Sequence, residues 1–316
     1  MAHPLHRVWE RIVEAAIKAC GYASVFFIGL ILLFLVKDAL PVLRSAGIGE
    51  LVGGTVWNPT AGEAGFGFLP LILGSLVVTL GALVVAIPMG VACATFLSEV
   101  APRVVREVAK PMVELLAAIP SIVFGFVGLV VMGDWVQGCA AALSKAVPGP
   151  EWLTEALNMP TGLSALTGAI VLGIMALPTI VSISEDALSA VPRAYRQASW
   201  ALGATRWQTI IGVTIPAAKS GIIAAIMLGV GRAIGETMAV LMVTGNSPVM
   251  PELVKGLFRP VRTMTATIAA EMGETAHQSP HYHALFMLGL ILFLITFAVN
   301  TAADIVTHKS KHVEHR

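Results

Sequence analysis

Arg232 and Glu236 are ionisable residues in the middle of a long apolar stretch, residues 221–244. A charged side chain at the centre of a membrane-spanning helix costs about 2.5–3.5 kcal/mol on insertion scales, so such residues are usually paired or functional. The two are four positions apart, which predicts that they share one helix face and pair. The guanidinium group of arginine can give an oxyanion two parallel hydrogen bonds while it stays charged. We therefore expect Arg232, Glu236 and Thr237 to line the path of an anionic solute; an ion pair that only fixes the helix to its neighbours is the alternative.

A second constellation lies in residues 192–216, with the sequence PRAYRQASWALGATRWQTIIGVTIP. Pro192 suits a helix start, and Gly203 suits a helix stop because glycine reaches the left-handed conformation without a side-chain clash. The sequence from Thr205 to Gln208 is a capping box, which predicts a second short helix. Two short helices that meet at a glycine would form an elbow. This elbow either rests on lipid headgroups or inserts into the groove of a partner protein.

The composition indicates that both constellations belong to an integral membrane protein. Of the 316 residues, 56% are hydrophobic and 12% are charged, whereas soluble globular proteins carry about 25% charged residues. Uncharged blocks of about 20 residues can each cross the hydrocarbon core as a helix. Six blocks meet this length, at about 19–36, 69–97, 112–132, 162–184, 221–244 and 284–303. We therefore predict an all-α bundle of six transmembrane helices.

The positive charges predict the orientation of this bundle. Thirteen Lys and Arg residues lie in the N-terminal segment, two of the connections and the C-terminal tail, whereas six lie in the other three connections. Because cytoplasmic segments carry the excess of Lys and Arg, both termini are expected in the cytoplasm. The predicted organisation is a cytoplasmic N-terminus (1–18), a first retained helix with an outward loop (19–68), a transmembrane core (69–304) that contains the cytoplasmic connection 185–220, and a cytoplasmic tail (305–316).

Other features argue against several classes of function. The net charge of +1 gives no reason to expect a nucleic-acid partner, and the three cysteines have no metal or redox spacing. His277, His281 and His283 are expected in a solvated loop rather than in a zinc site. No Gly-Lys dipeptide occurs, so a P-loop for ATP is absent from the sequence. We expect a transport subunit without a metal, a cofactor or an ATP site of its own, and not an enzyme.

The connection 185–220 resembles the EAA loop of ABC importer permeases. That family pattern is Glu-Ala-Ala, three residues, Gly, nine residues and Ile-x-Leu-Pro. The matching residues here are Gln197, Ala198, Ser199, Gly203, Val213, Ile215 and Pro216. Gln197 stands where the family has glutamate, which removes one charge. The resemblance implies that this loop, with Ala204 and Thr205, docks on a separate subunit that hydrolyses ATP. From its place after the second short helix, Pro216 is expected to open the fifth span.

Several segments narrow the resemblance further. They are residues 231–240 (GRAIGETMAV), 96–102 (FLSEVAP), 114–129 (ELLAAIPSIVFGFVGL), 267–274 (TIAAEMGE) and 288–300 (LGLILFLITFAVN). In this order they are similar to the PstC permease family of the bacterial phosphate-specific ABC transporter. The likeness covers most of the chain, from about residue 69 to residue 300.

This resemblance implies a phosphate importer in the bacterial inner membrane, with the six-helix fold of type I ABC importer permeases. In that family the permease pairs with a PstA-like permease, a PstB-like ATPase homodimer drives the pore, and a PstS-like binding protein in the periplasm or on a lipid anchor delivers phosphate. Arg232 and Glu236 carry over as residues implicated in phosphate passage. The alternatives are a permease for another oxyanion (phosphonate, molybdate or sulphate) and an ion-coupled secondary transporter, which would need no docking loop.

Overall fold

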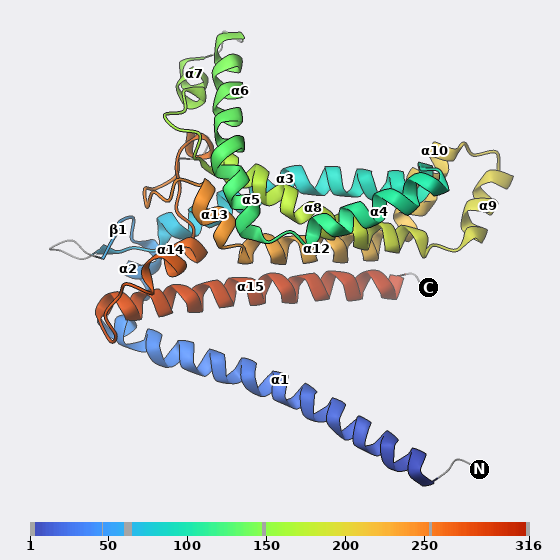
Figure 1. Cartoon of the computed structure of the whole chain (residues 1–316), viewed down its shortest axis with the longest axis horizontal. Helices are drawn as coiled ribbons and strands as arrows, with labels where there is room; N and C mark the ends of the chain where they lie inside the picture. The colour runs from blue at the N-terminus through green and yellow to red at the C-terminus, as the bar shows by residue number, and fades with distance from the viewer. Residues whose placement is uncertain (1–3, 46, 60–64, 147–149, 253–254, 314–316) are drawn as a thin grey trace.

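The computed structural model describes residues 4–45, 47–59, 65–146, 150–252 and 255–313, and most of them are helical (Figure 1). The first helices are α1 (Pro4–Ser45), α2 (Ile48–Gly53), α3 (Leu69–Thr95), α4 (Arg103–Ala117), α5 (Ser121–Val127), α6 (Gly133–Ala146), α7 (Glu151–Leu157) and α8 (Ala165–Ser189). The later helices are α9 (Arg193–Ala201), α10 (Arg206–Thr209), α11 (Ile215–Ala217), α12 (Lys219–Gly235), α13 (Met238–Val243), α14 (Met264–Glu271) and α15 (Pro280–Val313). Short π-helical turns are η1 (Phe96–Val100), η2 (Gly128–Met132) and η3 (Ile210–Thr214), and η4 (Lys255–Phe258) is a 3-10 turn. The strands β1 (Trp57–Asn58) and β2 (Gly65–Phe66) pair antiparallel.

Several of these segments are long and apolar enough to cross a membrane. Within the described residues, five qualify: Trp9–Arg44, Leu69–Val100, Ser121–Ala146, Ala165–Ser189 and Pro280–Ile305. A sixth span would come from the pair Arg206–Ala217 and Lys219–Gly235, whose axes are bent by 70°. The predicted all-α membrane architecture is confirmed, with up to six spans.

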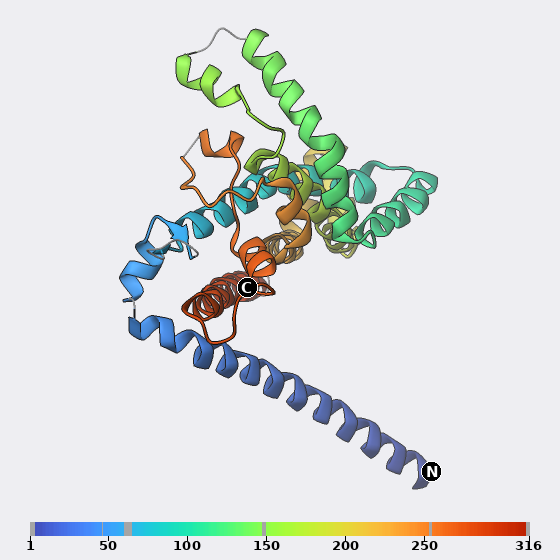
Figure 2. The same cartoon turned by 60° about the vertical axis from the view of Figure 1, so that its left-hand side comes forward.

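The centre of the bundle is made by α3, α8 and α12, which lie side by side (Figures 1 and 2). Glycines allow this close contact, as membrane helices pack best where small residues meet. A Cβ atom added to Gly81 would lie 2.8 Å from the Cβ of Ala169, and one added to Gly90 would lie 2.7 Å from Ile180. On α12, a Cβ at Gly229 would also lie 2.7 Å from Ile180. The central helices are therefore positioned by contacts that leave no room for larger side chains.

The first helix stands apart from this centre. Its C-terminal part packs against α15, with Ala39 and Val42 buried in a shared apolar cluster. Toward its N-terminal end α1 diverges from the bundle (Figures 1 and 2), and apolar side chains such as Ile17, Phe26 and Leu33 are exposed. An exposed apolar helix of this length suits lipid or another membrane subunit rather than water.

The third span differs from the prediction. Residues 112–132 do not form one helix, because α4 ends at Ala117 and a new helix starts at Ser121. Proline disfavours the helical conformation of the residue before it, so Pro120 ends the helix at this point. The candidate span is Ser121–Ala146, although it contains Asp134 and Lys145. The predicted boundaries are wrong because a proline interrupts the apolar run, and hydrophobicity alone does not show this break.

The fifth span also differs from the prediction. Instead of one helix over 221–244, α12 ends at Gly235, and Glu236 has an extended backbone with ψ of 132°. The chain then turns into the short helix α13. The fourth predicted span corresponds to α8, which extends to Ser189, past the predicted end at residue 184. These two differences change the surroundings of the ionisable residues described next.

Candidate functional site

Arg232 lies in the last turn of α12 and is partly buried, at the border between the exposed and the buried face of the helix. Ala225, Gly229 and Ala233 make the neighbouring face of the helix, which is buried in the bundle. Leu228, one turn before Arg232, is 56% exposed. Within the described part of the chain, the guanidinium group of Arg232 has no hydrogen-bond or ion-pair partner. This cation is free to meet a solute or a second subunit.

Glu236 does not pair with Arg232, which corrects the prediction. Its Oε1 atom accepts hydrogen bonds from the backbone N–H groups of Thr237 at 3.1 Å and Ala239 at 3.3 Å. The i,i+4 rule needs a continuous helix, and here the helix ends between the two residues. The first N–H groups of α13 have no partner within their helix, and the carboxylate of Glu236 satisfies two of them. Glu236 therefore shapes the break after α12.

Thr237 and Thr265 complete the polar surroundings of this break. The hydroxyl of Thr237 donates to the carbonyl oxygen of Gly235 at 3.2 Å, and that of Thr265 donates to the carbonyl oxygen of Glu236 at 2.9 Å. Thr265 belongs to α14, in the segment next to residues 267–274. The structure thus brings Arg232, Glu236 and Thr237 to one place, with Thr265 as a contact that the sequence did not indicate.

The role of Glu236 can be tested with two variants. Glu236→Gln keeps an acceptor oxygen for the N–H groups of α13, so we expect solute uptake within about twofold of the wild type. Glu236→Ala removes the acceptor and should lower the free energy of unfolding by about 1 kcal/mol, as loss of a helix cap does. Uptake and thermal unfolding of the purified variants would be measured together. If the glutamine variant loses uptake as fully as an Arg232 variant, the charge of Glu236 matters more than its capping role.

The predicted elbow is confirmed by α9 and α10. Gly203 has φ of +81°, and Thr205 and Gln208 form both hydrogen bonds of the capping box. Ala204 joins the two helices. On the outer side Tyr195 is exposed, and Leu202 is 89% exposed. An exposed apolar tip on a rigid elbow suits insertion into a partner groove better than a polar loop would.

The elbow residues from the EAA-like motif occupy different positions. Gln197 and Ala198 are exposed on α9, and the Ser199 hydroxyl lies 2.9 Å from that of Thr209. Pro216 lies in α11, before the 70° bend that leads into α12. The prediction that Pro216 opens the fifth helix is therefore wrong, since α12 begins at Lys219.

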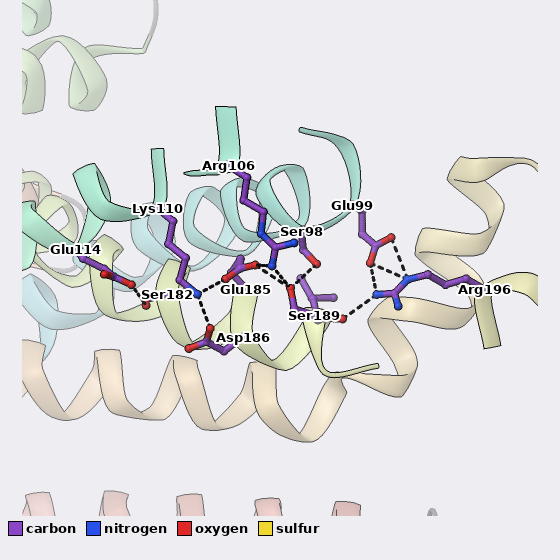
Figure 3. Close-up of polar contacts among 11 residues, drawn as sticks. Ser98, Glu99, Arg106, Lys110, Glu114, Ser182, Glu185, Asp186, Ser189 and Arg196 are labelled. Atoms are coloured by element: carbon purple, nitrogen blue, oxygen red, sulfur yellow. Dashed lines mark hydrogen bonds and ion pairs between the residues drawn. The ribbon is translucent and has the colours of Figure 1, made fainter. Parts of the chain in front are cut away.

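The elbow is fastened to the end of α3 through Glu99 (Figure 3). Arg196 Nη2 lies 2.5 Å from Glu99 Oε1, and the same guanidinium group donates to the carbonyl oxygens of Leu188 and Val191. Arg206 donates to the carbonyl oxygen of Glu99. Both short helices are thus attached to one point, so a push on the elbow would reach α3 and α8.

A buried ion-pair cluster joins α4 to α8, and the sequence did not indicate it. The carboxylate of Glu185, 1% exposed, pairs with Arg106 and with Lys110 Nζ at 2.6 Å (Figure 3). Lys110 also pairs with Asp186 at 2.5 Å, and the Ser189 hydroxyl donates to Glu185. Hydrogen bonds to Asp186 and then to Glu185 raise the pKa of Lys110 above its usual value.

The sequence predicts Glu185 at the start of the connection 185–220, and the positive charges of the connections indicate only the orientation of the bundle. The pairs join residues 79 and 75 positions apart. The available signal was the spacing of Arg106 and Lys110, which puts both cations on one face of a helix.

Glu185 should contribute strongly to the stability of the protein. Glu185→Gln keeps the shape but leaves two cations against a neutral group, so the free energy of unfolding should fall by about 3 kcal/mol, the lower end for a broken buried pair. Asp186→Asn is the matched control, because Asp186 is 64% exposed and an exposed pair contributes about 1 kcal/mol or less. Thermal unfolding of both purified variants provides the measurement. Equal loss in the two would contradict the role of burial.

Part of the histidine-containing segment 277–283 is packed rather than solvated: His281 and His283 are partly buried, whereas His277 is exposed. His281 Nε2 lies 2.8 Å from Glu271 Oε2, and Arg262 pairs with the same carboxylate. The indole N–H of Trp57, which is buried, donates to Glu271 at 3.3 Å. The expectation of a solvated loop is therefore wrong for His281. The described residues contain no group of three His, Cys, Asp or Glu side chains that could hold a metal ion.

Comparison with known proteins assigns this chain to a family. Residues 86–312 match the family described as binding-protein-dependent transport system inner membrane component. The chain belongs to this family. It is therefore an inner-membrane permease of a binding-protein-dependent transport system. The family match includes α8, the elbow and the broken fifth span.

Individual relatives cover most of the permease. The probable ABC transporter permease protein YqgH of Bacillus subtilis is 39% identical over 88% of this chain and 82% of its own length. The phosphate transport system permease protein PstC of Mesorhizobium japonicum is 35% identical over 92% of this chain and 87% of its own length. PstC of Haemophilus influenzae is 35% identical over 78% and 76%. These relatives extend the similarity beyond the family model toward the N-terminus.

Solved structures agree on the fold. A bacterial alginate ABC transporter, crystallised with an alginate-bound periplasmic protein, aligns with TM-score 0.59 and 14% identity over 96% of this chain and 98% of that chain. The inward-facing MetNI methionine transporter aligns with TM-score 0.55 and 17% identity over 76% and 94%. The permease has the fold of type I ABC importer permeases.

Proposed function

We propose that the chain is the transmembrane permease subunit of an ATP-driven phosphate importer. The observation that carries this proposal is the guanidinium group of Arg232, partly exposed at the edge of the open face of α12 and without a partner among the described residues, in a chain whose relatives include several phosphate permeases. An oxyanion is the solute class that arginine recognises best, because its planar fork matches two oxygen atoms. Arg232, Glu236 and Thr237 would lie on the phosphate path.

A second permease subunit is expected over the open face of α12. A guanidinium group that faced lipid near the membrane centre would be costly, whereas a water-filled path between two subunits would hydrate it. A PstA-like partner would supply the other wall of this path. Arg232 would then offer phosphate a transient positive site, since passage needs release as much as capture.

The ATPase would bind at the elbow. In Figure 1, α9 and the outer ends of α1 and α15 lie toward the same end of the molecule, which supports cytoplasmic termini and a cytoplasmic elbow. A PstB-like ATPase homodimer would receive the exposed side of α9, and its closure would move α3 and α8 through Glu99 and Arg196. A PstS-like binding protein would deliver phosphate at the opposite end, near α14 and β1.

The proposal is tested by uptake of radiolabelled phosphate at low external concentration, in cells that lack this chain and then regain it. Uptake should require the chain, and excess unlabelled phosphate should compete far better than sulphate, molybdate or phosphonate. If another oxyanion competes best, the permease serves that anion. If uptake does not depend on the chain, phosphate is not its solute.

A further inference from the structure

A cavity of about 310 Å³ lies behind the elbow, between α9 and the body of the permease. Arg193, Arg196 and Trp200 face it from α9, at spacings that share one side of a helix. The exposed Tyr195 and Leu202 are not part of its lining. Gln197 of the docking motif also lines the cavity, so the cavity borders the surface on which an ATPase would dock, while Tyr195 and Leu202 point elsewhere.

The lining combines cations with hydroxyl groups. Arg106 of α4 joins Arg193 and Arg196, and the hydroxyls of Ser98 and Ser189 lie 3.3 Å apart (Figure 3). The carboxylate that also lines the cavity, Glu99, is already bonded by the Nε and Nη2 atoms of Arg196. The lining contains three guanidinium groups and one carboxylate, so the net charge of its side chains is positive.

Arg193 carries the excess charge. Arg106 is shared with the buried Glu185, and Arg196 is committed to Glu99 and to backbone carbonyls. Within the described ranges, Arg193 has no hydrogen-bond or ion-pair partner. Its fork can give two parallel hydrogen bonds to one anion, and the hydroxyl of Ser98 can donate to a further oxygen atom, whereas the single O–H of Ser189 is already donated to Glu185.

We propose that this cavity is a second oxyanion site, built for a phosphate group and distinct from Arg232. A water molecule takes about 30 Å³ of liquid volume, so the cavity has room for a phosphate group with several waters. The group could belong to free phosphate or to the headgroup of a phospholipid, because both present the same oxygen atoms. Bound there, it would bridge α9 to α4 and stiffen the elbow. The site does not depend on which solute the permease carries.

Trp200 gives the site a local optical signal. The assembled transporter would be purified in a maltoside detergent without nucleotide, and sodium phosphate would be titrated at constant ionic strength in an Arg232→Ala background. We expect a saturable change in tryptophan fluorescence that disappears in Trp200→Phe. Arg193→Ala should weaken binding at least tenfold. Arg103→Ala is the matched control, because Arg103 is an exposed arginine on α4 outside the cavity.

Native mass spectrometry of the same samples distinguishes the two sources. Phospholipid that is retained by the Arg232→Ala transporter and lost when Arg193→Ala is added would identify a lipid headgroup, whereas titration without retained lipid would identify free phosphate. Either result supports the site. The proposal is overturned if neither phosphate nor phospholipid binds in a way that depends on Arg193. Because Arg232 is absent from these samples, this outcome is independent of the transport pathway.

Discussion

Replacing Arg232 by alanine should slow phosphate uptake strongly while the permease still reaches the membrane. Hydrogen bonds to charged groups contribute about 1.5–3 kcal/mol, so loss of this fork should slow uptake roughly ten- to hundredfold. Stability should change little, because the guanidinium group has no partner among the residues that the structure describes. Initial rates of phosphate uptake, normalised to the amount of permease in the membrane, give the measurement.

Two further variants define what Arg232 does. Arg232→Lys keeps a positive charge but loses the planar fork, so we expect partial uptake if geometry matters and full uptake if charge alone suffices. Leu228→Ala is the matched control, since Leu228 lies on the same open face one turn away. Normal uptake by Arg232→Ala would contradict a phosphate path along α12.

The second large effect is expected at Gly203. Its φ of +81° is a conformation that β-branched residues avoid, so Gly203→Val should strain or reshape the elbow at a cost of about 1–3 kcal/mol. No atom lies within 4 Å of a Cβ at this position, so the effect would come from the backbone and not from a clash. We expect phosphate uptake to fall about tenfold, with ATP hydrolysis no longer linked to transport.

Gly212→Val provides a close control for this elbow variant. Gly212 is also exposed with open space around it, but its φ is not in the left-handed region. The Gly212→Val variant should therefore keep most of the phosphate uptake of the wild type. Equal loss in the two variants would show that bulk, rather than the turn at Gly203, affects docking.

The elbow could be predicted from the sequence because its signals are local. A glycine stop and a capping box act over four residues, and they determine the turn wherever the loop lies. The spans were placed approximately by the same kind of local information, the length of uncharged blocks. Pro120 shows the limit of this approach. Because this proline interrupts an apolar run, the third span begins at Ser121 and not at residue 112 as predicted.

The surroundings of the ionisable residues could not be predicted in the same way. Pairing of Arg232 with Glu236 required a continuous helix, but the carboxylate of Glu236 bonds two backbone N–H groups of α13 instead. The buried cluster at Glu185 depends on contacts between α4 and α8, which are distant in the chain. Such contacts are set by tertiary packing, which periodicity and composition do not contain.

The central claim is tested most directly in proteoliposomes that contain the assembled transporter, with phosphate accumulation and ATP hydrolysis measured together. The wild type should accumulate phosphate only with ATP and binding protein. Arg232→Ala should still hydrolyse ATP but accumulate almost no phosphate. Phosphate accumulation by Arg232→Ala at the wild-type rate, or none by the wild type, would contradict a phosphate permease with Arg232 on its path.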